Sequence, residues 1–229
     1  ELELGVGNLT LGALVQLPST SQWWYNQSVP MRSYYSDAVS AAVRRPWADW
    51  RLRFAPGRPS IAIHIRRGDI GVQDGRLLPN EYYYDLMERL RLHLPDADVH
   101  VWSSLQSNSW KLADRSSWWG SSEFDGFRAR GARVHLDDEA LLEPWVHMAR
   151  ADVFIMSSSS FSWVPAVLNP NCVISTRHID RAFEGWVPGQ QELDGKAGGK
   201  LRECIERSGL KSMAPTTTAA PTTTALPTT

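Results

Sequence analysis

Hydrophobic positions follow two different periods from residue 61 onward. The run from Ile61 to Ile65 is short and rich in β-branched residues, which is typical of a strand buried on both faces of a parallel sheet. Between such runs, apolar positions recur every three or four residues, as in Tyr83, Leu86 and Leu90, and this spacing indicates a helix. Further strands are predicted at residues 99–102, 133–136, 152–156 and 172–174.

The predicted helices lie between these strands. Asn80 is expected to cap the first helix, and Pro95 to close it. Pro165 is expected in the first turn of the last helix, where proline is tolerated. Two further helices are predicted at about residues 123–130 and 137–148. This alternation predicts an α/β fold, a Rossmann-like parallel sheet with flanking helices and right-handed crossovers.

The chain divides into three predicted parts. Residues 59–211 hold the α/β domain. Residues 1–58 precede it, with helical spacing from residue 36 to residue 50, and they are too few for a complete domain of about 100 to 150 residues. Residues 212–229 are rich in Thr and Pro and cannot bury a core, so a disordered tail is predicted there.

Composition and charge narrow the range of partners. The formal net charge of -1 gives no reason to expect nucleic acid or an anionic membrane surface as a partner. No run approaches the ~18 apolar residues that a membrane span needs, so no span is expected.

The two cysteines, Cys172 and Cys204, lack the spacing of a zinc site. A single disulfide in an oxidising compartment and a pair of free thiols both stay open.

The candidate chemistry follows the Ile61 strand, where Arg66, Arg67, Gly68 and Asp69 stand together. Ligands of open α/β sheets bind beyond the carboxyl ends of the strands. Two guanidinium groups at such a place suit a diphosphate, because each planar fork bonds two oxygens at once. One alternative is that both arginines are solvated and Asp69 caps the next turn. Another is an Arg-Gly-Asp adhesion tripeptide, which requires an exposed loop tip.

Two motifs of the chain resemble those of the fucosyltransferase superfamily, which includes α1,2-, α1,6- and protein O-fucosyltransferases. His64–Asp69 is similar to the family's first motif, His-x-Arg-Arg-x-Asp. Met148–Met156, continued by Ser159–Trp163, is similar to its last motif, most closely the α1,2 version. The resemblance spans about residues 59–175. It implies the donor-binding half of a GT-B glycosyltransferase that uses GDP-fucose.

The resemblance implies roles for individual residues. Arg67 matches the arginine that contacts the donor β-phosphate and is required for transfer. His64, Arg66 and Asp69 match the neighbouring donor-binding positions. Asp74 lies five residues after Asp69, where the α1,6 enzymes place a glutamate proposed as general base, and a carboxylate there suits proton transfer from the acceptor hydroxyl. The alternative for Asp74 is an ordinary solvated loop carboxylate.

The last motif adds further candidates at a strand-to-helix junction. Hydroxyls and backbone N–H groups at such a junction can hold phosphate oxygens, and they can also cap the helix. Glu143 stands beside Pro144, where the family has an acidic residue, and is included as a donor-binding candidate. The junction residues are Ser159, Ser160, Phe161 and Ser162.

The function implied by the resemblance is inverting transfer of fucose from GDP-fucose to a glycan or glycoprotein acceptor. No metal is expected, and the implied location is the secretory pathway, in the Golgi lumen. The segment Val101–Leu105 lacks the paired aspartates of the family's middle motif. A catalytically inactive nucleotide-sugar- or glycan-binding module of the same fold is therefore the alternative. A third interpretation, another Rossmann-like protein with a phosphorylated ligand, lacks a glycine-rich phosphate fingerprint.

Overall fold

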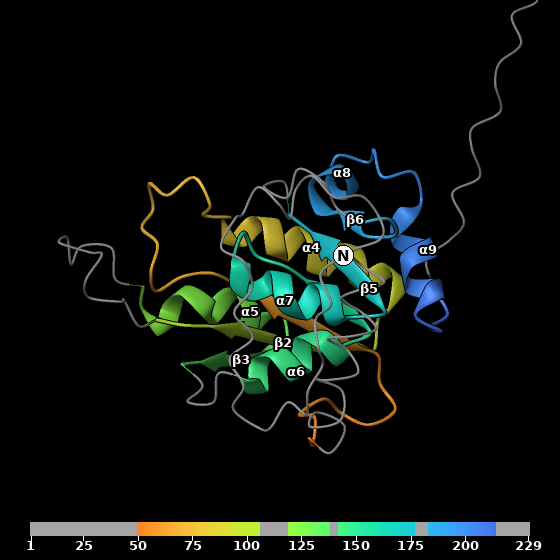
Figure 1. Cartoon of the computed structure of the whole chain (residues 1–229), viewed down its shortest axis with the longest axis horizontal. Coiled ribbons are helices and arrows are strands. Elements are labelled where there is room, and N and C mark those ends of the chain that lie inside the picture. Colours follow the sequence, from red (N-terminus) through yellow and green to blue (C-terminus); the bar gives the residue numbers. More distant parts are fainter. Residues whose placement is uncertain (1–49, 106–118, 138–141, 177–182, 214–229) are drawn as a thin grey trace, which may run out of the picture.

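A six-stranded sheet forms the centre of the computed structural model, which describes residues 50–105, 119–137, 142–176 and 183–213 (Figure 1). Its strand order is β3-β2-β1-β4-β5-β6, and every neighbouring pair is parallel. The predicted α/β fold with a Rossmann-like parallel sheet is confirmed at this level. The strands are β1 (Ser60–His64), β2 (Asp98–Ser103), β3 (Arg133–Leu136), β4 (Val153–Ile155), β5 (Cys172–Ser175) and β6 (Val187–Pro188).

Helices cover both faces of the sheet (Figure 1). The side chains of Ile61 and Ile63 pack in one hydrophobic cluster with α4, α5 and α9. Ala62, between them, packs on the other face with α6 and α7, as the alternation of side chains along a strand requires. The helices are α4 (Asn80–His93), η3 (Ser121–Phe124), α5 (Asp125–Ala129), α6 (Leu142–Arg150), α7 (Ser160–Leu168), α8 (Gly189–Leu193) and α9 (Lys200–Arg207).

The strand order reverses direction at β1. The chain leaves β1 toward β2 and β3, then crosses to β4 on the other side of β1. The loops that follow β1 and β4 consequently lead to helices on opposite faces of the sheet. Doubly wound sheets bind ligands in the crevice at such a switch point. The residues from Ile65 and from Met156 onward lie at this place.

Two details of the predicted helices were wrong. Asn80 is the first residue of α4 rather than its cap; Pro79 precedes it, and no side-chain cap is present. The Asn80 amide is occupied elsewhere, with Arg67 and Glu123. The helix α7 begins at Ser160, so Pro165 lies beyond its first turn. Pro165 has no backbone N–H to donate, and its side chain is buried within this nine-residue helix. The helix predicted at 36–50 lies outside the described residues.

The segment before β1 packs on the same sheet. The Arg53 backbone N–H donates to His147 Nε2 of α6 at 2.9 Å, and the Ala55 N–H donates to the Asp98 carboxylate of β2 at 2.7 Å. Phe54 lies between these contacts, against Trp102. Residues 50–58, which we assigned to the N-terminal segment, therefore contact the α/β domain directly.

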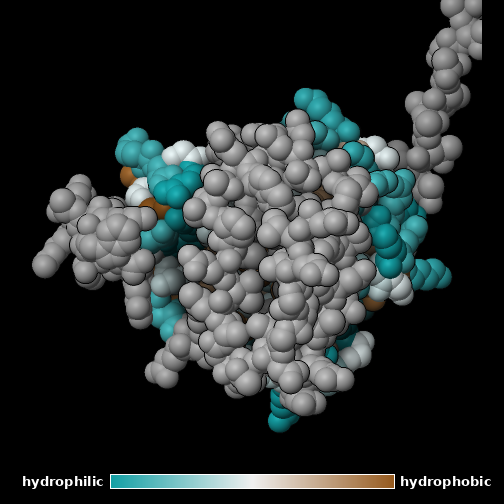
Figure 2. All heavy atoms as spheres, viewed as in Figure 1, coloured by the Kyte–Doolittle hydropathy of each residue, from teal (hydrophilic) through white to brown (hydrophobic). Residues whose placement is uncertain are grey.

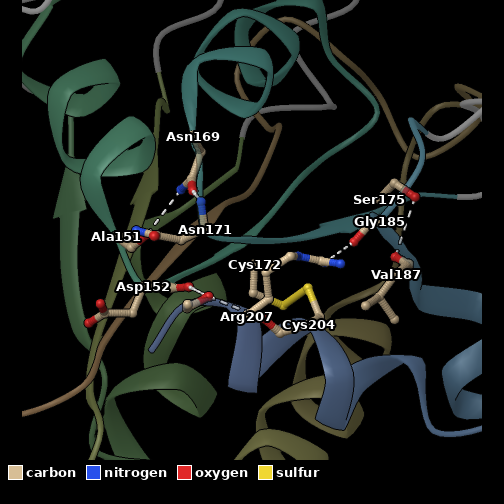
Figure 3. Close-up of a disulfide and its surroundings, with 11 residues drawn as sticks. Ala151, Asp152, Asn169, Asn171, Cys172, Ser175, Gly185, Val187, Cys204 and Arg207 are labelled. Atoms are coloured by element: carbon tan, nitrogen blue, oxygen red, sulfur yellow. Dashed lines mark hydrogen bonds between the residues drawn. A yellow bond between two sulfur atoms is a disulfide. The ribbon is translucent and has the colours of Figure 1, made fainter. Parts of the chain in front are cut away.

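A disulfide joins Cys172 of β5 to Cys204 of α9, across 32 residues of sequence (Figure 3). Both cysteines are fully buried. The pairing settles the alternative that the sequence left open, in favour of a bridge. Around it, Arg207 donates to the Gly185 carbonyl and Ser175 contacts the Val187 carbonyl. These contacts fasten α9 and β6 to the outer strands of the sheet.

The visible surface of the described residues is mainly hydrophilic around the edge of the view (Figure 2). The large apolar side chains that are exposed, among them Val72 and Leu92, are few. Among the helices of the described ranges, none has the length and apolar content to cross a bilayer.

Candidate functional site

The carboxyl ends of β1 and β4 bring His64 together with two serines. His64 Nδ1 lies 2.8 Å from Ser157 Oγ and 2.5 Å from Ser162 Oγ. Ser162 Oγ also accepts the backbone N–H of Ser157 at 3.1 Å. Because Ser157 follows β4 and Ser162 belongs to α7, the histidine ties the end of β1 to the strand-to-helix junction after β4.

His64 is electrically neutral in this arrangement. Burial, and after it the positive charge of Arg66, lowers the pKa of His64 from 6.5 to about 3. The Phe161 ring lies 4.9 Å from the imidazole, centroid to centroid, and shields it from water. A neutral imidazole with one nitrogen between two hydroxyls is a positioning group, and it adds no charge to the site.

Arg66 is held in a fixed orientation beside this cluster. Its Nε and Nη2 donate to the two carboxylate oxygens of Asp69, at 3.0 and 2.6 Å. Its Nη1 lies 3.3 Å from the Ser158 carbonyl oxygen. A bidentate pair of this kind fixes the guanidinium plane. Burial opposes ionisation of Asp69, but the hydrogen bonds and charge of Arg66, with Arg76 beyond, hold its pKa below the usual value.

Arg67 points to the opposite face of the sheet. Its side chain is buried, with a residue exposure of 3%. The guanidinium donates to the Arg66 and Leu78 carbonyl oxygens at 2.9 and 3.2 Å, and to Asn80 Oδ1 at 2.5 Å. Side chains alternate along an extended chain. Arg66 therefore points to the same side as His64, and Arg67 points to the same side as Ile65. The structure therefore separates the two guanidinium groups.

A carboxylate and an indole complete the surroundings of Arg67. Glu123 Oε1 of η3 lies 3.6 Å from Arg67 Nε, and the Trp119 ring lies 4.7 Å from the guanidinium carbon. Trp119 Nε1 in turn donates to the Ile70 carbonyl oxygen. Burial lowers the pKa of Arg67, and Tyr83 and Glu123 oppose this. These contacts give Arg67 a structural place between the loop after β1, α4 and η3.

Asp74 is engaged by Arg76 two residues later. The carboxylate accepts two bonds from the guanidinium, at 2.9 and 2.5 Å, and one from the Arg76 backbone N–H at 2.9 Å. The Arg76 hydrogen bonds are the main reason that the pKa of Asp74 falls from 3.8 to about 2. A carboxylate with so low a pKa is a weak base while Arg76 stays in place.

The remaining predicted residues take different places. Ser159 caps α7, since its Oγ accepts the Phe161 backbone N–H at 3.1 Å. Ser160 is exposed at the start of the helix. Glu143, in the first turn of α6, pairs with Arg53 Nε at 2.7 Å. Arg53 Nη1 continues to His135 Nδ1 of β3, so Glu143 belongs to contacts on the β3 side of the sheet.

The structure thus brings together only part of the predicted set. His64, Arg66, Asp69, Phe161 and Ser162 gather at the switch point, whereas Arg67, Asp74 and Glu143 each have another partner. The sequence analysis missed Ser157 and Ser158, because a run of four serines does not show which hydroxyl meets His64. Their place directly after a buried strand was the signal that pointed to them.

Fixed guanidinium and hydroxyl groups at a switch point can bind an anion. Arg66 pairs with Asp69 and Arg76 with Asp74, while Arg67 lies on the other face beside Glu123, so the site offers an anion preorganised hydrogen-bond donors rather than an excess of positive charge. Within the described ranges, no three His, Cys, Asp or Glu side chains are grouped so as to hold a metal ion.

The fold defines a doubly wound α/β protein with a candidate ligand site at its switch point. No protein-family model, curated protein or solved structure matched this chain in comparisons with each.

Proposed function

We propose that this chain binds GDP-fucose at the carboxyl ends of β1 and β4, as the donor half of an inverting fucosyltransferase of GT-B architecture. The acceptor is a glycan or glycoprotein, and the proposed location is the Golgi lumen. In this reaction the acceptor hydroxyl oxygen attacks the anomeric carbon of fucose. A base takes the hydroxyl proton, and the bond from that carbon to the β-phosphate oxygen breaks to release GDP.

The observation that carries the proposal is the Arg66–Asp69 pair beside the His64–Ser162 contact. Asp69 fixes the plane of the Arg66 guanidinium, whose side chain is 16% exposed and so is accessible to a ligand. A preorganised guanidinium can stabilise the charge that develops on a leaving diphosphate. In this proposal Arg66 takes the phosphate contact, and Arg67 fixes the loop that carries Arg66, through its bond to the Arg66 carbonyl oxygen.

A binding module without turnover is a second candidate, and the Asp74–Arg76 pair favours it. A base must accept a proton during transfer, and the pKa of Asp74 is about 2. If Asp74 is the base, Arg76 has to release it when the substrates bind.

Thermal unfolding with a panel of nucleotides tests the proposal. GDP and GDP-fucose are expected to raise the melting temperature, because a ligand that binds only the native state stabilises it. UDP and NAD are the matched controls and are expected to leave it unchanged. A shift with UDP and none with GDP would contradict the proposal.

Release of GDP from GDP-fucose then separates the enzyme from the binding module. Water serves as the acceptor in this assay, since the natural acceptor is unidentified. The enzyme is expected to release GDP in the presence of protein above the rate in buffer. Stabilisation by GDP-fucose without any release, with water or with a panel of glycan acceptors, would support the binding module.

A further inference from the structure

A cavity of about 170 Å³ lies on the α4 side of the sheet, at the amino ends of β1 and β2. Ile61 and Val99, which face one another across the two strands, form part of its wall. The candidate donor site lies beyond the carboxyl end of β1, after His64. The cavity is therefore separate from the candidate donor site and lies at the opposite ends of the strands.

The floor of this cavity is apolar and belongs to the hydrophobic core, whereas its exposed lining is mainly polar. Ile61, Met87 and Leu94 are at most 4% exposed and pack in the same cluster of buried side chains. Close-packed side chains of this kind hold their shape without a ligand. The floor is consequently preformed, and the cavity is comparable in volume to enclosed cavities of about 150 Å³ that hold benzene, although it opens to solvent.

Three arginines, Arg58, Arg91 and Arg130, line the same cavity. Backbone carbonyl oxygens hold each of them. Arg58 donates to the Asp96 carbonyl at 2.6 Å, Arg91 to the Arg130 carbonyl at 2.8 Å, and Arg130 to the Gly126 carbonyl at 3.0 Å. Arg130 also lies over the Tyr84 ring, 3.9 Å from its centroid. Carbonyl groups orient a guanidinium without cancelling its charge, so the positive charges stay in place.

The carboxylate of Glu88 partly balances the charge of these three arginines. Glu88 lies 3.0 Å from Arg91 Nη1 and 3.9 Å from Arg130 Nε, and its side chain is 55% exposed. In the part of the chain that the structure describes, no ion pair involves Arg58, and Glu88 is the acidic partner of the other two. The cavity thus combines a small apolar floor with an excess of positive charge at its rim.

We propose that this cavity binds a small organic anion, with one carboxylate or phosphate group on an apolar group the size of a single aromatic ring. The apolar group would lie against Ile61, Met87 and Leu94, and the anionic group among the guanidinium groups. Guanidinium forks match the geometry of carboxylate and phosphate oxygens. Binding pockets generally combine such an apolar lining with a few placed polar groups.

Calorimetry and two-dimensional NMR with phenyl phosphate and with benzoate test this proposal and show which anionic group is preferred. Both probes are expected to bind more tightly than benzyl alcohol, which has the ring without the charge, and than inorganic phosphate, which has the charge without the ring. The NMR shifts are expected at Met87, Leu94 and Val99. Equal binding of benzyl alcohol, or shifts confined to other residues, would overturn the proposal.

Single substitutions on α4 provide a matched pair. Arg91→Gln is expected to weaken phenyl phosphate binding at least about tenfold, because a hydrogen bond to a charged group is lost. Arg89→Gln removes the same charge from the same helix, at a residue that does not line the cavity, and is expected to leave binding within about twofold. Glu88→Gln is expected to strengthen binding. Equal losses for Arg89→Gln and Arg91→Gln would reduce the effect to net charge and contradict the site.

Arg66→Gln separates this cavity from the proposed donor site. Phenyl phosphate binding is expected to survive this substitution, whereas GDP binding is expected to weaken. Loss of phenyl phosphate binding in Arg66→Gln would place the probe at the switch point and overturn the second site, without affecting the proposed function.

Discussion

Arg66 and Arg67 are adjacent in the chain, yet their guanidinium groups contact opposite faces of the sheet. Arg66 meets Asp69 and the Ser158 carbonyl on the side of α7, and Arg67 meets Asn80 and Glu123 on the side of α4. An Arg-Arg pair at the end of a strand therefore does not form one doubly charged clamp. The two residues have different roles, and substitutions can distinguish them.

Arg67→Lys is expected to destabilise the fold. A lysine cannot reach the Leu78 carbonyl and Asn80 at once, so buried acceptors are left without donors. We expect the free energy of unfolding to fall by roughly 2 to 3 kcal/mol, somewhat less than for a fully buried pair because Glu123 is 30% exposed. Urea unfolding measures this change. Arg128→Lys, in an exposed pair with Asp125, is the control, and equal stability of the two variants would contradict the structural role of Arg67.

Acid is expected to destabilise the protein partly through His64. Its pKa in the folded state is about 3, against the ordinary value of 6.5, so below about pH 6.5 the unfolded chain binds a proton that the folded chain does not. The free energy of unfolding therefore falls as the pH falls from about 6.5 toward about 3. The contribution of one such histidine is about 1.4 kcal/mol per pH unit.

Denaturant unfolding of wild type and His64→Asn at pH 7.5, 6 and 5 checks this expectation. The variant is expected to show a shallower loss of stability with falling pH. His135 contributes in the same direction in both proteins, because burial lowers its pKa from 6.5 to about 4. Identical slopes for the two proteins would show that His64 does not titrate as described.

Arg76→Ala is expected to raise the pKa of Asp74 from about 2 toward its ordinary value of 3.8, since the Arg76 hydrogen bonds are the main cause of the low value. An NMR titration of the Asp74 carboxyl carbon measures it. Asp125, which pairs with Arg128 at the surface, is an internal reference in the same spectrum. No change in the Asp74 titration would mean that Arg76 does not hold the carboxylate in solution.

Loss of the disulfide is expected to cost roughly 3 to 4 kcal/mol of stability, because the Cys172–Cys204 bridge closes a loop of 32 residues in the unfolded chain. Thermal unfolding of the Cys172→Ala, Cys204→Ala double variant measures the loss. Reducing agent is expected to lower the melting temperature of the wild type and to leave that of the double variant unchanged. A wild type insensitive to complete reduction would contradict the stabilising role of the bridge.

The sequence predicted the central strands well because they are buried on both faces and are short apolar runs, as in β4 and β5. The edge strand β3 is less buried, yet it also has the predicted bounds, residues 133–136. The β6 strand was missed, since two residues carry no periodicity. In α9, the spacing of Leu201, Cys204 and Ile205 was a helical signal that we did not use.

The site was less predictable than the sheet. Motif matching placed His64, Arg66 and Ser162 at one edge, and the fold brings them there. It did not reveal which arginine faces which side, because that depends on how far the extended geometry of β1 continues past His64. Nor did it reveal that Asp74 pairs with Arg76, since two residues in a loop can turn toward or away from each other.

The most direct test of the account is the dissociation constant of GDP for Arg66→Lys and Arg67→Lys, measured by calorimetry at a temperature where both variants are folded. Our account predicts that Arg66→Lys weakens GDP binding about tenfold to a hundredfold, because a point charge replaces a fork that bonds two phosphate oxygens. It predicts that folded Arg67→Lys binds GDP within a few-fold of the wild type. Unchanged affinity in Arg66→Lys together with lost affinity in folded Arg67→Lys would contradict the assignment of the anion site to Arg66.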